Sequence, residues 1–257
     1  MLGKLLRYET RATARTFIPI YMALLVVSTI NRVFRVNNID IGFNLSALII
    51  VGLFISLGVL TLIMVIQRFN KNLLSDEGYL MFTLPVKISD LVLSKVLISF
   101  LWTIVSSIIG VIAILILLGD ATFFEQVGTL LTVDNWNLFL QGIRDGFGGN
   151  PIILIIELII IGICMYSSTI LTIYLSISVG QLPLLNKHRV LFSFIAYFLF
   201  NTVGQWVLIM IDKLYNSLNI DLSSTVELSI ATLFCVGLNI ALFYAINFIL
   251  VKHLNLE

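Results

Sequence analysis

Residues 41–66 read IGFNLSALIIVGLFISLGVLTLIMVI, which is 26 consecutive positions without an acidic or basic side chain. An α-helix rises about 1.5 Å per residue, so about 20 residues are enough to cross the roughly 30 Å of hydrocarbon in a bilayer. The strict polar–apolar alternation of a transmembrane barrel strand is not seen. This stretch therefore predicts a membrane-spanning helix.

The rest of the 257-residue chain contains five further stretches of this kind. Hydrophobic residues make up 59% of the sequence and charged residues only 11%, whereas a soluble domain is about a quarter charged. These values exclude a soluble enzyme, a disordered tail and a disulfide scaffold. The sequence predicts an all-α membrane protein, with residues 1–257 forming one transmembrane domain. Its six spans are expected at about 17–34, 41–66, 91–118, 151–179, 190–211 and 226–251.

The positive charges predict the orientation of these spans. Cytosolic loops of membrane proteins are enriched in Lys and Arg. If the N-terminus is cytosolic, 11 of the 15 cations lie inside and 4 lie outside, and six spans place both termini in the cytosol. The inner set is Lys4, Arg7, Arg11, Arg15, Arg68, Lys71, Lys87, Lys95, Lys187, Arg189 and Lys252, and the outer set is Arg32, Arg35, Arg144 and Lys213.

Residues 1–16 precede the first predicted span and have a basic helical face. The pattern predicts an amphipathic helix at the inner membrane surface, with its cations toward anionic headgroups. A plain positive-inside anchor explains the same charges equally well. Glu9 falls among the apolar positions, which would suit contact with a protein partner. A cleaved signal peptide over residues 1–34 is the competing interpretation, but no Ala-x-Ala-like site follows the apolar run before Asn31 and Arg32.

The longest predicted outer loop covers residues 119–150. Asp134 could cap a helix with Trp136 and Phe139 on one side, and this helix would lie at the outer headgroups. The glycines at 146, 148 and 149 are expected to form a flexible hinge before Pro151.

The predicted inner loop 67–90 is the most unusual segment. Ser75, Asp76 and Glu77 are typical of a helix start, and Pro85 disfavours helix at the residue before it. The residues between them are mostly apolar, so a short amphipathic helix is expected at the cytosolic face. Such a patch is covered either by the inner leaflet, as a membrane-surface hairpin, or by a groove on another protein.

This loop resembles the cytosolic loop of ABC-2 type permeases. In that family Glu-x-Gly-Thr-Leu is followed by Leu-x-x-x-Pro-Val and then by Gly-Lys at the next span. The chain departs from the pattern at Tyr79, where Thr is usual, and at Ser94, where Gly is usual. The residues that carry the resemblance are Glu77, Gly78, Tyr79, Leu80, Thr83, Leu84, Pro85 and Val86, followed by Leu93, Ser94 and Lys95.

The layout of the chain is also similar to that of the small stand-alone ABC-2 permeases of Gram-positive bacteria. The resemblance implies a type V exporter-like fold, in which two six-helix membrane subunits form a homodimer or heterodimer and each binds a separate cytosolic ABC ATPase. ATP and Mg would be bound by that ATPase, and this chain would need no cofactor. The loop would hold the coupling helix, with Glu77, Gly78, Tyr79, Leu80, Thr83, Leu84 and Pro85 contacting the ATPase.

Polar residues within the spans are candidates for a transport pathway. Those in the fifth span repeat every four residues, and polar groups in hydrocarbon require partners. They could line a central cavity, as the resemblance implies, or hydrogen-bond to other helices of the same chain. Glu157, an acid within a span, could act in transport, remain hydrated near the headgroups, or pair with Arg144. The pathway candidates are Ser193, Tyr197, Asn201, Gln205 and Glu157, together with the weaker candidates Asn44, Ser46 and Ser56 of the second span.

The expected function is export of an amphipathic substrate, such as an antimicrobial peptide, a drug or a lipid-like molecule, across the bacterial cytoplasmic membrane. An ATP-independent channel or secondary carrier, and a membrane-embedded enzyme, are the alternatives. Enzyme chemistry needs convergent acids, histidines or metal ligands, and coupled carriers usually have several buried ionisable groups. The chain contains no P-loop pattern and no Cys/His cluster with metal-ligand spacing.

Overall fold

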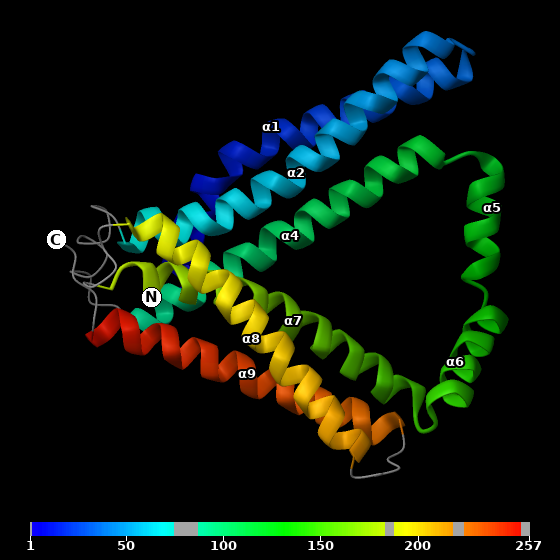
Figure 1. Ribbon diagram of the computed structural model, residues 1–257. Coiled ribbons are helices and arrows are strands. Elements are labelled where there is room, and N and C mark those ends of the chain that lie inside the picture. The colour runs from blue at the N-terminus through cyan, green and yellow to red at the C-terminus, as the bar shows by residue number, and fades with distance from the viewer. Residues whose placement is uncertain (1, 75–86, 183–187, 218–223, 253–257) are drawn as a thin grey trace. The chain divides into compact units, whose positions relative to one another are not determined.

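The structure is a computed structural model that describes residues 2–74, 87–182, 188–217 and 224–252 (Figure 1). These residues form helices, and no strand occurs among them. Six of the helices are long and apolar enough to cross a membrane, which confirms the predicted number of spans. The helices are α1 (Leu2–Val36), α2 (Asp40–Leu74), α4 (Ile88–Leu118), α5 (Ala121–Leu130), α6 (Val133–Phe147), α7 (Pro151–Gly180), α8 (Arg189–Ser217) and α9 (Ser224–Lys252).

The described helices group into two compact units. The first unit contains α1, α2 up to Phe69, α4 and α5, and the second contains α6, α7, α8 and α9. The spanning helices are longer than the apolar stretches that predict them: α2, for example, continues to Leu74 rather than ending at Ile66. Hydropathy marks only the part of a helix that suits hydrocarbon, whereas hydrogen bonding continues the helix into polar sequence.

In the first unit, α1 and α2 form an antiparallel hairpin (Figure 1). Asn38 lies at the turn with a φ of 55°, a left-handed conformation that Asn tolerates better than most residues. Near the turn, Asn31 Nδ2 donates to Ser46 Oγ at 2.7 Å and to the Phe43 carbonyl at 3.0 Å. These bonds satisfy polar groups that would otherwise be buried without partners.

Helix α4 runs parallel to α1, as the first and third spans of a membrane protein should. Contacts pair Glu9 with Lys95 near the start of α1 and Arg32 with the Ile116 carbonyl near its end. Arg32 also donates to the Gly119 carbonyl at 2.7 Å. A basic side chain at the C-terminal end of α4 is favourable, because the last carbonyl groups of a helix lack intrahelical partners and carry partial negative charge.

Residues 2–16 and the first predicted span belong to one helix, because α1 continues without interruption from Leu2 to Val36. The sequence predicts a separate surface helix before the span. Pro19 removes one backbone donor from α1 but does not end the helix. Packing of α1 along α4, from Glu9 to Arg32, accounts for this continuity, since tertiary contacts stabilise a helix more than propensity does.

In the second unit, α7 packs against both α8 and α9. Two polar contacts lie between α7 and α9: Ser229 Oγ donates to Glu157 Oε1 at 2.6 Å, and Asn239 Nδ2 donates to the Cys164 carbonyl at 2.9 Å. Gly180, the last residue of α7, packs against the first turns of α8. A Cβ atom at Gly180 would collide with the hydroxyl group of Ser193. A glycine therefore permits the close approach of α8 to the end of α7.

The predicted helix in the outer segment is α6, which begins one residue before Asp134. Thr132 holds the N-cap position without a side-chain bond, so the prediction that Asp134 is the cap is wrong. Gly148 and Gly149 have positive φ values of 70° and 83° and make the turn that leads to α7. Helix α5 lies in a segment that the sequence predicts to be a loop.

Candidate functional site

Three charged side chains from three spanning helices meet in the first unit. Lys95 of α4 donates its ammonium group to Glu9 Oε1 of α1, and Arg68 Nη1 of α2 lies 3.6 Å from Glu9 Oε2. The side chains of Glu9 and Lys95 are 1% and 3% exposed, and that of Arg68 is 23% exposed. This group of Glu9, Lys95 and Arg68 is called the charge cluster below.

The charge cluster connects α1, α2 and α4 at one level. Charged groups are expensive to transfer out of water, so a carboxylate this well buried requires opposite charges close to it. Lys95 and Arg68 supply two, which leaves the cluster with a formal charge of +1. Because removal of one partner would leave a buried charge poorly compensated, the cluster fixes which residues of the three helices face each other.

A layer of polar and aromatic contacts adjoins the charge cluster along α1 and α4. Thr13 Oγ1 donates to the Glu9 carbonyl at 2.7 Å and accepts from Trp102 Nε1 at 2.6 Å. The Trp102 ring stacks on Phe17, with centroids 4.7 Å apart. Tyr21 and Ser106 share a hydrogen bond of 2.7 Å. The side chains on α1 follow one another every four residues, which places them on one face of the helix.

Two residues of the charge cluster lie on the helices that flank the segment 75–86. Arg68 lies six residues before the end of α2 at Leu74, and Lys95 lies seven residues after the start of α4 at Ile88. Both are therefore about two helical turns from the segment that joins the two helices. Lys95 also belongs to the Leu93-Ser94-Lys95 motif that contributes to the family resemblance.

The predicted ATPase-contacting residues lie outside the described residues, since Glu77, Gly78, Tyr79, Leu80, Thr83, Leu84 and Pro85 all fall in the segment 75–86. Of the predicted loop 67–90, residues 67–74 belong to α2 and residues 88–90 to α4. The flanking helices thus extend further into this loop than its polar composition indicates.

The polar residues of the fifth span lie on α8. Asn201 and Gln205 are exposed, and Tyr197 and Ser193 are half-buried. Asn201 Nδ2 donates to the Tyr197 carbonyl at 2.9 Å, within its own helix. The second unit therefore leaves Asn201 and Gln205 uncovered, and in a membrane such groups favour contact with other protein surface or with water.

The remaining pathway candidates do not gather at one place. Asn44 is exposed on α2, whereas Ser46 is buried and accepts from Asn31. Glu157 of α7 is half-buried and accepts from Ser229 of α9. The bond to Ser229 connects two spanning helices, which gives Glu157 a packing role within the second unit. Pairing of Glu157 with Arg144 is not found among the described contacts.

The charge cluster is not among the sites predicted from the sequence. Glu9 stands out in the sequence as an acid among apolar positions, for which a protein partner is expected. Its partners are instead Lys95 and Arg68 of the same chain. Both cations are counted in the sequence as ordinary inner charges. An isolated Lys within the apolar stretch 91–118 was the available signal, because such a residue usually pairs inside the protein.

Comparison of the chain with protein-family models, curated protein sequences and solved structures finds no match. The fold itself defines a class, which is that of all-helical, multi-pass membrane proteins. Among the described residues, no group of three or more His, Cys, Asp or Glu side chains could hold a metal ion.

Proposed function

We propose that this chain is the membrane subunit of an ATP-driven exporter of the ABC type, in the bacterial cytoplasmic membrane and with both termini in the cytosol. The energy comes from a separate cytosolic ATPase that binds the 75–86 segment. The observation that carries the proposal is the position of the charge cluster, which connects α1 to the two helices that flank this segment. The sequence resemblance of the segment to ABC-2 permeases supports the same function.

Such a connection suits the transmission of force. An ATPase that closes on ATP has to move helices inside the bilayer. Arg68 and Lys95 lie about two turns from the ends of α2 and α4, and Glu9 holds both through charge contacts. A displacement of the 75–86 segment would therefore move α1, α2 and α4 together.

The proposed transport unit contains a second permease, identical or related. Most side chains of α8, including Asn201 and Gln205, are exposed, and Ala196 is buried. Without a polar partner these two side chains would face hydrocarbon, which is unfavourable. A second permease would cover them and could enclose a pathway for an amphipathic substrate.

The role of the 75–86 segment can be tested with charge-reversing and charge-inserting variants. Glu77→Arg and Leu80→Arg are expected to weaken ATPase binding about thirtyfold, the effect of losing a strong interface residue, and to uncouple ATP hydrolysis from transport. ATPase recovered with the tagged chain and transport in membrane vesicles are the two measurements.

Leu131→Arg is the matched control. Leu131 is an exposed leucine between α5 and α6, on the predicted outer side, so this variant should retain the ATPase and transport activity. Normal coupling in both loop variants would show that the interface assignment is wrong.

A further inference from the structure

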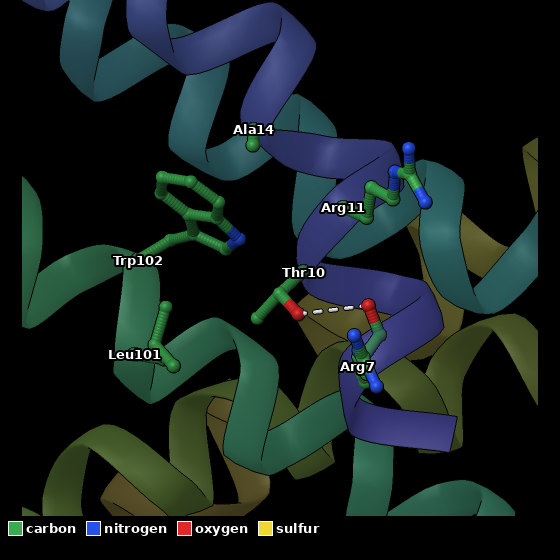
Figure 2. Close-up of a pocket in the computed structure, with 6 residues that line it drawn as sticks. All are labelled: Arg7, Thr10, Arg11, Ala14, Leu101 and Trp102. Carbon is green, nitrogen blue, oxygen red and sulfur yellow. Dashed lines mark hydrogen bonds between the residues drawn. The ribbon is translucent and has the colours of Figure 1, made fainter. Parts of the chain in front are cut away.

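A pocket of about 480 Å³ opens on the surface of the first unit between α1 and α4 (Figure 2). One part of its lining is cationic and the other is apolar. The residues that line it are Arg7, Thr10, Arg11, Ala14, Leu101 and Trp102.

The cationic part of the pocket comes from α1. Arg7 and Arg11 are exposed and lie four residues apart, so they are neighbours on one face of the helix. In the part of the chain that the structure describes, the ion pairs of Glu9 are with Lys95 and Arg68, and no carboxylate pairs with Arg7 or Arg11. Two adjacent guanidinium groups with up to five N–H donors each are therefore available to an anion.

The rest of the pocket lining is mostly apolar, and its polar side-chain groups already form hydrogen bonds within the protein. Leu101 and Trp102 come from α4, and Ala14 comes from α1 (Figure 2). The Trp102 N–H already donates to Thr13, and the Thr10 hydroxyl donates to the Arg7 carbonyl at 3.0 Å. A ligand of the pocket would therefore gain polar contacts from the two arginines and apolar contacts from α4.

We propose that this pocket binds an anionic phospholipid, with the phosphate at Arg7 and Arg11 and the start of an acyl chain against Leu101 and Ala14. The ligand needs a negative headgroup and a hydrocarbon portion, and an anionic lipid of the surrounding membrane has both. Both lining helices are long and apolar enough to span that membrane, so the pocket is within reach of lipid. The inference is independent of the ATP-driven function, because lipid binding requires neither an ATPase nor a transported substrate.

The test is native mass spectrometry of the full chain in neutral detergent, titrated with phosphatidylglycerol or with zwitterionic phosphatidylcholine of the same acyl chains. Phosphatidylglycerol should bind at least tenfold more tightly. Arg7→Gln and Arg11→Gln should each weaken its binding about fivefold, and the double variant about thirtyfold, as expected for loss of one and two basic contacts near a headgroup.

Arg15→Gln is the matched control, because it removes the same charge from the exposed surface of α1 at a residue outside the pocket lining. This variant should bind phosphatidylglycerol within twofold of the unmodified chain. An equal loss in Arg15→Gln and in the two pocket variants would overturn the proposal in favour of diffuse charge attraction. Equal affinity for the two lipids would also overturn it.

Inorganic phosphate provides a second arm that distinguishes a lipid from a free anion. At millimolar concentration and constant ionic strength, phosphate should change the affinity for phosphatidylglycerol by less than twofold. Free phosphate makes no apolar contact with Leu101 and Trp102 of α4 and should therefore compete weakly. Displacement of the lipid by phosphate would show that the pocket is a site for small anions, contrary to the proposal.

Discussion

Replacement of Lys95 with methionine should lower the free energy of unfolding by about 3–5 kcal/mol, the range typical of removing one partner of a buried ion pair. Methionine keeps most of the apolar stem of lysine, so the change chiefly removes the charge. Glu9 is 1% exposed and would lose the cation that contacts its Oε1 atom. Arg68 remains near Glu9 Oε2, which places the expected value toward the lower end of this range. Reversible unfolding in mixed micelles, followed by circular dichroism, gives the measurement.

A double variant separates the charge effect from a packing effect. If Lys95→Met acts through the uncompensated carboxylate, Glu9→Met in the same chain should restore part of the lost stability, because apolar residues often replace a buried ion pair without loss. Arg68 loses its carboxylate partner in this double variant, and its side chain is 23% exposed and so can be partly hydrated. If the double variant is as unstable as the sum of the two single variants, the two side chains do not interact as the geometry indicates.

The chain also contains an exposed ion pair that serves as a control. Arg35 Nη2 and Asp120 Oδ2 lie 3.1 Å apart, and their side chains are about half exposed. Asp120→Asn should change the free energy of unfolding by less than about 1 kcal/mol, as for other solvated pairs. An effect of Lys95→Met as small as that of Asp120→Asn would contradict the burial of the charge cluster.

Replacement of Trp102 with alanine is the second large effect and should lower the free energy of unfolding by about 3–5 kcal/mol. Trp102 is 6% exposed, stacks on Phe17 and donates its N–H to Thr13. Alanine would leave a cavity between α1 and α4 and remove both contacts. Trp102→Phe keeps an aromatic ring but loses the donor, so a smaller loss of about 1–2 kcal/mol is expected. Thermal or chemical unfolding of the purified chain measures both.

Trp136→Ala provides the comparison for Trp102. Trp136 lies on α6 and is 52% exposed. Its removal should change the stability by no more than about 0.5 kcal/mol, the usual range for surface substitutions. Similar losses for Trp136→Ala and Trp102→Ala would show that Trp102 does not form part of a packed interface between α1 and α4.

The spanning helices could be predicted because each depends on a local property, the length of an apolar stretch. Residues 41–66 predict α2 without any knowledge of the other helices. The ends of the helices could not be predicted in the same way. Helix α1 begins at Leu2 and α2 ends at Leu74, in polar sequence where packing and backbone hydrogen bonds decide the boundary.

The charge cluster depends on contacts between residues 86 positions apart, such as Glu9 and Lys95. Such a pairing requires the register of α1 against α4, which periodicity in one helix does not specify. Glu9 could be recognised as unusual, because an acid among leucines needs a partner, but its partner could not be identified. The charge cluster is visible in the structure but could not be predicted, whereas a function for the 75–86 segment is predicted from its composition and family resemblance. The residues of this segment lie outside the described structure.

Recovery of a tagged chain from its native membrane in mild detergent tests the proposed function most directly. A P-loop ATPase is expected to co-purify in comparable amounts, and the complex is expected to hydrolyse ATP. Chemical crosslinking in the membrane before extraction guards against loss of a weakly bound subunit. Recovery of the folded chain without a nucleotide-binding partner, after crosslinking as well as without it, would contradict the proposal that a separate ATPase drives this protein.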